Sequence, residues 1–157
     1  MREPFIVEWP GVTPRGLTYK QPIQFVDVLP TFLAAVGKRP DDDRVYDGTN
    51  ILPVLTSGKK IDRGDIFYYD DVAPAGHLNA VRRGDWKLHV RRVAGPYFVA
   101  RNFDATEETP QLFNLRRDPG ESYDLSEHYP EIVAELRARI TQFDADLRAD
   151  HAAVYGA

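Results

Sequence analysis

Residues 80–90 read Ala-Val-Arg-Arg-Gly-Asp-Trp-Lys-Leu-His-Val, and this stretch decides the fold of the second half of the chain. Two short runs of strand-forming residues flank Gly84 and Asp85, a pair that suits the tight turn of a β-hairpin. Further outward, residues 65–69 and 111–115 are also rich in strand-forming residues and end at turn residues. The pattern therefore predicts an antiparallel sheet between residues 65 and 116.

An amphipathic helix is expected after this sheet. Its apolar residues recur at steps of four, four, three and four: Ile132, Leu136, Ile140, Phe143 and Leu147. This spacing places them on one side of a helix, and Pro130 suits its first position, where no hydrogen bond from the proline nitrogen is needed. We expect the helix to pack that side on the sheet.

The first part of the chain has a different pattern. Phe5–Trp9 is a short apolar run between prolines, which predicts a strand. Apolar residues at steps of three and four predict a helix over 25–36, with Gly37 as its C-terminal cap. Pro30 belongs in its first turns or at a kink, and residues 47–55 predict a further short helix. The expected fold is α/β: a strand–helix unit in residues 1–60, then a small antiparallel sheet with a C-terminal helix in 61–157.

Composition excludes several classes of protein. The formal net charge is −4 and the charges are interspersed, so no basic face favours nucleic acid. No run of about 18 apolar residues predicts a membrane span. The absence of cysteine excludes disulfides, thiolate zinc sites and cysteine nucleophiles. Nothing at the N-terminus has the pattern of a signal peptide, which predicts a cytoplasmic chain if it is expressed as it stands and otherwise leaves the compartment open.

Five motifs, in order along the chain, resemble the arylsulfatase family. They are Arg-Glu-Pro-Phe leading to Trp-Pro-Gly in 2–11, Asp-x-x-Pro-Thr in 27–31, Asp-Gly-Thr-Asn-Ile-Leu-Pro-Val-Leu in 47–55, Ala-Val-Arg-x-Gly-Asp-Trp-Lys-Leu in 80–88, and Leu-Phe-Asn-Leu with Asp-Pro-Gly-Glu in 112–121. One departure is Asp124, which stands where the family has an asparagine. The resemblance implies the C-terminal portion of a sulfatase.

The same resemblance implies what is missing. The family hydrolyses sulfate esters with a formylglycine residue, made from Cys or Ser in a Cys/Ser-x-Pro-x-Arg motif, beside calcium or magnesium. These groups and a catalytic lysine precede the matched strand in the family. Ser57, Ser122 and Ser126 do not begin that motif. We therefore assign no catalytic residue, no metal ligand and no cofactor to this chain.

Two candidates for a site deserve a test. Asp70-Asp71 follows a predicted strand and could begin a metal site, although a solvated turn is the interpretation that we favour. The four histidines lack zinc-site spacing, and His89 we expect to be structural. His77 lies in a loop of the kind that can border the substrate pocket in the family. Substrate binding by His77 is thus one hypothesis, and a surface histidine in a mobile loop is the favoured alternative.

The densest basic stretch has two interpretations. Its members are Arg82, Arg83, Lys87, Arg91 and Arg92. They could attract a sulfated substrate. Alternation along strands would instead point them to opposite faces, where they pair with acidic side chains or face solvent, and we favour this second interpretation.

The leading hypothesis for function is a scaffold and substrate-entrance role within a sulfatase, with no activity for the chain alone. The alternatives are a non-catalytic interaction module and the C-terminal part of a related phosphoryl hydrolase. An apolar strand at Phe5–Trp9 needs neighbours for its backbone groups. We therefore expect this segment to bind either a second copy of the chain or an upstream sulfatase half, with a sulfate ester as the substrate of the whole enzyme.

Overall fold

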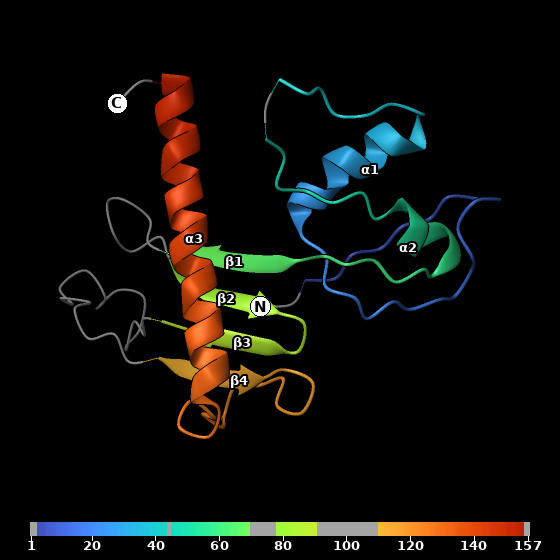
Figure 1. The fold of residues 1–157 in the computed structure, drawn as a ribbon. Helices are drawn as coiled ribbons and strands as arrows, with labels where there is room; N and C mark the ends of the chain where they lie inside the picture. The colour runs from blue at the N-terminus through green and yellow to red at the C-terminus, as the bar shows by residue number, and fades with distance from the viewer. Residues whose placement is uncertain (1–2, 44, 70–77, 91–109, 156–157) are drawn as a thin grey trace, which may run out of the picture. The chain divides into compact units, whose positions relative to one another are not determined.

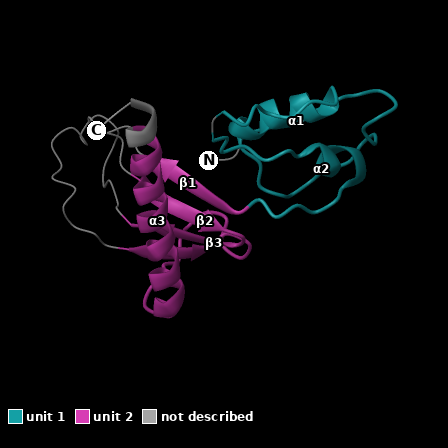
Figure 2. Cartoon of the chain, turned by 45° about the horizontal axis from the view of Figure 1, so that its top comes forward, with its two compact units in different colours: residues 1–63 teal, residues 64–157 magenta. Residues whose placement is uncertain are grey.

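The computed structural model describes residues 3–43, 45–69, 78–90 and 110–155. The chain divides into two compact units, Met1–Arg63 and Gly64–Ala157 (Figure 2). Among the described residues, no helix combines the length and the apolar character that a membrane crossing requires.

The second unit contains a four-stranded antiparallel sheet and one long helix (Figure 1). Its strands are β1 (Asp65–Tyr69), β2 (Leu78–Arg83), β3 (Trp86–His89) and β4 (Gln111–Asn114), arranged in sequence order. The helix α3 (Pro130–Tyr155) lies across one face of the sheet. The predicted sheet, hairpin and C-terminal helix are all confirmed.

The hairpin between β2 and β3 turns at the residues that the sequence indicated. Arg83 pairs with Trp86, which leaves Gly84 and Asp85 as the connection. Gly84 has a φ of +57°, a left-handed conformation that glycine adopts at no steric cost. This tight turn fixes the register of the two central strands.

The core of the second unit lies between α3 and the sheet. Strand residues that alternate in sequence point to the same face, so Val81, Leu88 and Leu112 all face the helix. There they form one cluster with Leu136, which is 1% exposed. Phe67 also faces the helix, and its ring stacks on that of Phe143.

The predicted apolar side of α3 packs on the sheet except at its far end, where Leu147 remains 46% exposed. The expectation for Leu147 was therefore wrong. The helix has 26 residues and is about 39 Å long, whereas four strands span only about 14 Å between the outer axes. Phe143 already packs on Phe67 of β1, the edge strand, and α3 continues past this strand (Figure 1). Leu147 is one turn further along the helix.

The first unit contains a 3-10 turn and two short helices: η1 (Phe25–Asp27), α1 (Val28–Ala35) and α2 (Leu52–Ser57). Pro30 is the third residue of α1, where its missing N–H leaves no helical hydrogen bond unmade. Gly37 follows the helix with a φ of +73°, as expected for a C-terminal cap. Both predicted helices are present, but with other bounds: α1 ends before Val36, and α2 starts only at Leu52 and runs to Ser57, whereas 47–55 was expected.

Phe5–Trp9 does not form the predicted strand. The segment has no regular secondary structure and is followed by a turn, where the carbonyl oxygen of Trp9 accepts hydrogen bonds from the N–H groups of Val12 and Thr13. The physical reason is that a strand exists only where a neighbour pairs its backbone donors and acceptors. No described residue of this chain pairs with 5–9 in a sheet.

Candidate functional site

The face of the sheet opposite α3 carries a buried group of charged side chains. Lys87 and His89 are two residues apart on β3, so both point to that face. Glu121 reaches both: its Oε1 accepts from Lys87 Nζ at 2.7 Å, and its Oε2 lies 2.6 Å from His89 Nε2. Lys87 is only 7% exposed, so one carboxylate joins a buried ammonium to an imidazole.

Glu121 is held in place by the turn that precedes it. This turn begins at Asp118, whose Oδ2 accepts hydrogen bonds from the N–H groups of Ser122 and Tyr123 at 2.7 and 2.9 Å. Glu121 itself has a φ of +55°, a conformation that costs a residue with a side chain of this size some free energy. The Asp-Pro-Gly-Glu motif thus aims a carboxylate at β3.

Asp124 anchors the next step of the same segment. Its Oδ1 accepts hydrogen bonds from the backbone N–H of Leu112 at 3.0 Å and of Ser126 at 2.9 Å. Burial alone would raise the pKa of Asp124, but these hydrogen bonds outweigh it and the pKa is lowered. An asparagine Oδ1 could accept the same two bonds, so the departure from the family pattern leaves this anchor intact.

The electrostatics of the Lys87–His89–Glu121 group follow from burial and pairing. Burial lowers the pKa of His89, and the hydrogen bond to Glu121 opposes this only in part. Burial pushes the pKa of Glu121 upward, but the hydrogen bonds from Lys87 and His89 prevail and the pKa is lowered. Lys87 Nζ also lies 4.8 Å above the ring centre of Tyr68, a cation–π contact. At neutral pH the group is therefore a Lys⁺–Glu⁻ pair beside a neutral histidine.

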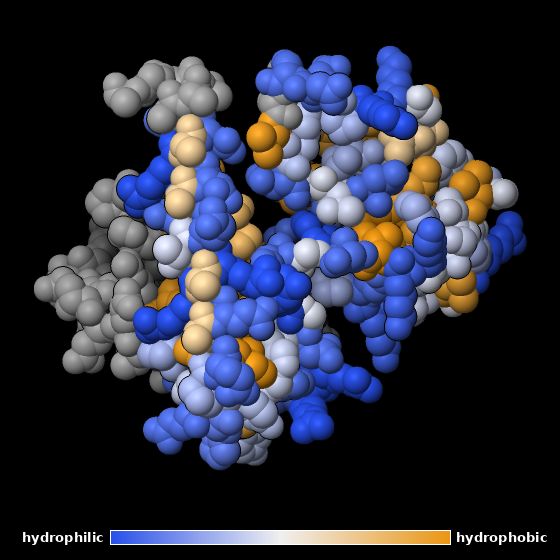
Figure 3. Space-filling model, viewed as in Figure 1, coloured by the Kyte–Doolittle hydropathy of each residue, from blue (hydrophilic) through white to orange (hydrophobic). Residues whose placement is uncertain are grey.

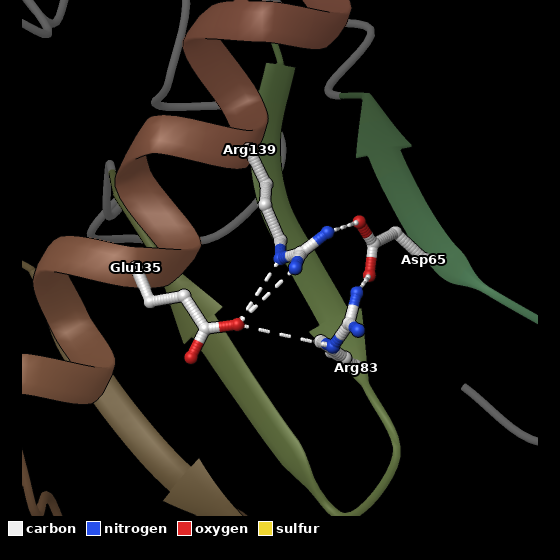
Figure 4. Close-up of polar contacts among 4 residues, drawn as sticks. All are labelled: Asp65, Arg83, Glu135 and Arg139. Atoms are coloured by element: carbon white, nitrogen blue, oxygen red, sulfur yellow. Dashed lines mark hydrogen bonds and ion pairs between the residues drawn. The ribbon is translucent and has the colours of Figure 1, made fainter.

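A second charged group lies where α3 crosses the β1 edge of the sheet. It ties α3 to β1 and β2 (Figure 4). Asp65 accepts from Arg139 at 3.0 Å and from Arg83 at 3.2 Å. Glu135 lies 3.3 Å from Arg139 and 3.9 Å from Arg83. Each arginine thus faces two carboxylates, and neither is left as a free cation for a sulfate group.

A third polar group lies inside the first unit, at the Asp-x-x-Pro-Thr motif. Asp27 is fully buried. Its Oδ1 accepts from Thr49 N–H, and its Oδ2 accepts from Gln24 N–H and Arg63 Nε, at 2.8 to 3.1 Å. Arg63 also donates to Gln24 Oε1. The buried carboxylate therefore organises the unit around itself.

Thr31, one turn along the helix from Asp27, completes this group. Its hydroxyl donates to the carbonyl oxygen of Asp27 at 2.6 Å and accepts from Ile51 N–H at 3.0 Å. Gly48 lies where the two segments approach, since a Cβ there would be 2.0 Å from the carbonyl oxygen of Val26. The family motifs at 27–31 and 47–55 are thus one structural contact.

The sequence candidates have mixed outcomes. His77, Asp70-Asp71, Arg91 and Arg92 lie outside the described residues. Arg83 and Lys87 point to opposite faces and pair with acidic side chains, as alternation predicted. The expectation of a solvated face is wrong for Lys87, because Glu121 and Tyr68 cover it.

Sequence reasoning did not single out Glu121 or Asp27 as centres of polar networks. The one available signal was their place in the two family motifs.

The formylglycine and divalent cation that the family implies do not fit the described residues. A hard cation needs several converging carboxylate or amide oxygens, and in residues 3–43, 45–69, 78–90 and 110–155 no three histidine or acidic side chains gather so. The chain has no cysteine. The carboxylates described above are instead engaged with lysine, arginine, histidine or backbone N–H groups.

A family model described as the C-terminal region of aryl-sulfatase matches residues 62–155. N-acetylgalactosamine-6-sulfatase of Mus musculus is 34% identical, over 90% of this chain and 29% of its own length. Arylsulfatase of Hemicentrotus pulcherrimus is 32% identical, over 79% of this chain and 25% of its own length. The chain thus spans less than a third of these relatives.

Solved structures show the same fold. The PsFucS1 sulfatase from Pseudoalteromonas sp. has a TM-score of 0.67 at 20% identity, over 90% of this chain and 29% of its own. Ps i-CgsB has a TM-score of 0.65 at 21% identity, over 86% and 27% respectively. Together with the match over residues 62–155, which is more than half of the sequence, these findings identify the chain as a member of the aryl-sulfatase family, corresponding to its C-terminal region.

Proposed function

We propose that this chain is the C-terminal scaffold of a sulfate-ester hydrolase and that it does not turn over substrate alone. In this role it completes the enzyme and borders the substrate entrance, while the nucleophile, the cation and its ligands come from the catalytic portion. The curated relatives that it matches are sulfatases, and about seven tenths of each lies outside the match.

The proposal rests on the pairing of the charged side chains. Lys87, Asp65 and Asp27 are each engaged by partners within their own unit. A reacting group must instead be presented to a substrate with its activating base or metal beside it. What the described residues supply is support for a sheet, a helix and a turn, which is the work of a scaffold.

His77 is retained in the proposal as a residue of the substrate entrance. The relatives include an N-acetylgalactosamine-6-sulfatase, an arylsulfatase and a steryl-sulfatase. What these names have in common is sulfatase activity, and a sulfate ester is therefore the substrate class that we assign to the whole enzyme. A histidine can donate a hydrogen bond to a sulfuryl oxygen.

The first experiment is an activity assay on the purified chain. It is incubated with p-nitrophenyl sulfate and with p-nitrophenyl phosphate, in the presence of calcium or magnesium, beside a full-length sulfatase as positive control. We expect no release of nitrophenol from either ester, with hydrogen exchange showing that β3 and α3 are folded. Turnover of the sulfate ester by the chain alone would overturn the proposal.

The second experiment reads the coding DNA that precedes this sequence. A frame that encodes Cys-x-Pro-x-Arg or Ser-x-Pro-x-Arg, either continuous with this chain or beside it, is the expected result. A gene that starts at Met1 with no such frame nearby contradicts the scaffold role and favours an independent interaction module.

A further inference from the structure

The strand β1 is an edge of its sheet, and its outer side has no partner strand among the described residues. The carbonyl oxygen of Asn79 accepts from Val90 N–H, so the odd-numbered residues of β2 direct their backbone groups to β3 and the even-numbered ones direct theirs to β1. Ile66 and Tyr68 lie opposite even-numbered residues of β2. Phe67, between them, therefore directs its N–H and carbonyl groups to the outer edge.

This edge lacks the features by which proteins commonly prevent the pairing of a further strand, namely lysine, proline or a bulge. The strand reads Asp-Ile-Phe-Tyr-Tyr, which contains neither lysine nor proline, and its register is irregular only at the step from Tyr68 to Tyr69. The charge of Asp65 is offset by Arg83 and Arg139. The backbone of β1 is thus suited to pairing around its middle residue.

The helix α3 extends beyond this edge, over the place that a further strand would occupy (Figure 1). Phe143 stacks on Phe67, with ring centres 3.9 Å apart. The overhang after it, residues 144–155, continues for about 18 Å, whereas one added strand needs about 4.8 Å. Leu147 lies about 6 Å further along the helix than Phe143, close to that strand spacing. An added strand would therefore lie under Leu147.

Exposed apolar side chains of the second unit occur at this same place. Among the described residues, the large exposed hydrophobic side chains of the unit are Tyr69, Tyr123 and Leu147. Tyr69 ends β1 and is 50% exposed, and Leu147 on the overhang is 46% exposed. Elsewhere α3 turns its apolar side to the sheet, and its outward face is mainly hydrophilic (Figure 3). Leu147 is thus exposed because the helix continues past the sheet.

Acidic side chains flank Leu147 on the overhang. Asp144 and Asp150 are each three positions from Leu147, which places them about 60° around the helix on its two sides. Asp150 is exposed, and Asp144 pairs with Arg148 at 2.9 Å. Residues 144–150 contain three aspartates and one arginine. The surface around Leu147 is therefore acidic, and lysine or arginine on an added strand would complement it.

A strand from another protein fits this place better than a second copy of β1. Two copies paired antiparallel through this edge would be related by a twofold axis, which puts both α3 helices on one face of the joint sheet. Each overhang would then extend over the other copy, and both carry the same acidic charge. A strand that brings no helix of its own meets neither difficulty. Several peptide-binding proteins add a strand to a sheet edge in this way.

We propose that the outer edge of β1 and the overhang of α3 bind an extended segment of a partner protein, which joins the four-stranded sheet as one more strand. Side chains at alternate positions of a strand share a face. The residue opposite Phe67 therefore points toward α3 and is apolar, and the residues two positions before and after it are lysine or arginine. The proposal concerns the second unit alone and does not rest on the scaffold function.

The experiment measures amide hydrogen exchange in the purified full chain, with the peptide acetyl-Thr-Lys-Thr-Val-Thr-Lys-Thr-amide as the probe. We expect fast exchange at Phe67 in the chain alone, because its N–H points to the outer edge. At about 1 mM peptide, exchange at Phe67 should slow by about tenfold, while Leu88 in the central strand β3 keeps its rate. The same peptide with glutamate in place of lysine should leave the rate at Phe67 unchanged.

A pair of matched variants tests the overhang. Leu147→Lys places a positive charge over the added strand and should abolish the slowing at Phe67. Tyr123→Lys makes the same kind of replacement at a residue that is 74% exposed in the turn after β4, and it should leave the slowing intact. The exchange rate at Leu88 reports that both variants keep the fold.

Three results would overturn the proposal: no slowing at Phe67, equal slowing by the glutamate peptide, or slowing that survives Leu147→Lys. Slow exchange at Phe67 in the chain alone also overturns it, because the edge is then already paired. If that protection depends on protein concentration, the occupant is a second copy, and if it does not, the occupant is a segment of the same chain.

Discussion

The ammonium of Lys87 lies 2.7 Å from Oε1 of Glu121, and this contact joins the centre of the sheet to the turn after β4. The two residues are 34 positions apart. Glu121 keeps a left-handed backbone conformation while making the contact. Residues in such conformations persist where the surrounding structure requires them. The pair therefore determines how the segment from β4 to α3 returns over the sheet.

Replacing Glu121 by glutamine should destabilise the second unit by about 2 kcal/mol, because a buried ammonium loses its counter-charge. Hydrogen exchange of the β3 amides in increasing urea measures the free energy of opening. The double variant Lys87→Met with Glu121→Gln removes the buried charge as well. Its free energy of unfolding should fall by less than that of Glu121→Gln alone. A loss of stability in the double variant that equals or exceeds the loss in Glu121→Gln would contradict the pairing of Lys87 with Glu121.

Acid should destabilise the second unit in two stages. Burial lowers the folded-state pKa of His89 below 6.5, and pairing with Lys87 and His89 lowers that of Glu121 below 4.5. In both cases the unfolded chain binds more protons, so stability falls as pH falls. The first loss begins below pH 6.5 and belongs to His89, and the second begins below 4.5.

The free energy of unfolding measured between pH 8 and 3 checks this order. His89→Gln should remove the loss of stability that begins below pH 6.5 and leave the loss below 4.5 in place. Stability that rises on acidification from pH 7 to 5 would show that His89 is protonated in the fold.

Local pattern was sufficient for the parts of the fold whose partners are close in sequence or repeat regularly. Gly84 marked the hairpin because a tight turn needs its conformation. The steps from Ile132 to Phe143 marked α3 and its packing side. Periodicity reports which side of a helix is apolar, but not whether anything covers it. In α1, Leu29 and Phe32 remain 53 and 66% exposed.

Contacts between distant segments could not be predicted in this way. Asp27 looked like an ordinary helix residue, and its partners Thr49 and Arg63 come from loops 22 and 36 positions away. The pairing of Glu121 with His89 depends on the return of a turn over 32 positions. The expected strand at Phe5–Trp9 failed for a related reason, since a strand is defined by a neighbour that this segment does not find.

Asp27→Ala should open the first unit. It would leave the N–H groups of Gln24 and Thr49 without their acceptor and Arg63 without its counter-charge, at about 2–3 kcal/mol. The expected signature is faster hydrogen exchange at Thr49 and faster tryptic cleavage after Arg63. Asp42→Ala, at an exposed position of the same unit, is the control and should change neither rate. Protection of Thr49 that survives Asp27→Ala would mean that the carboxylate does not organise this unit.

Gly48→Ala should be far more disruptive than Gly120→Ala, although both replace a glycine by the same side chain. A Cβ at Gly48 would lie 2.0 Å from the carbonyl oxygen of Val26 and 2.7 Å from its carbon, so the backbone must move. A Cβ at Gly120 meets Ser122 Oγ at 3.4 Å, which is an ordinary contact.

The movement at Gly48 would pull Thr49 away from Asp27, so we expect a loss of about 2 kcal/mol or more in the first unit. Gly120→Ala should stay within about 0.5 kcal/mol. Hydrogen exchange at Thr49 and at Ser122 measures the two effects in their own units. Similar, small effects of both substitutions would show that residues 47–51 do not press against η1.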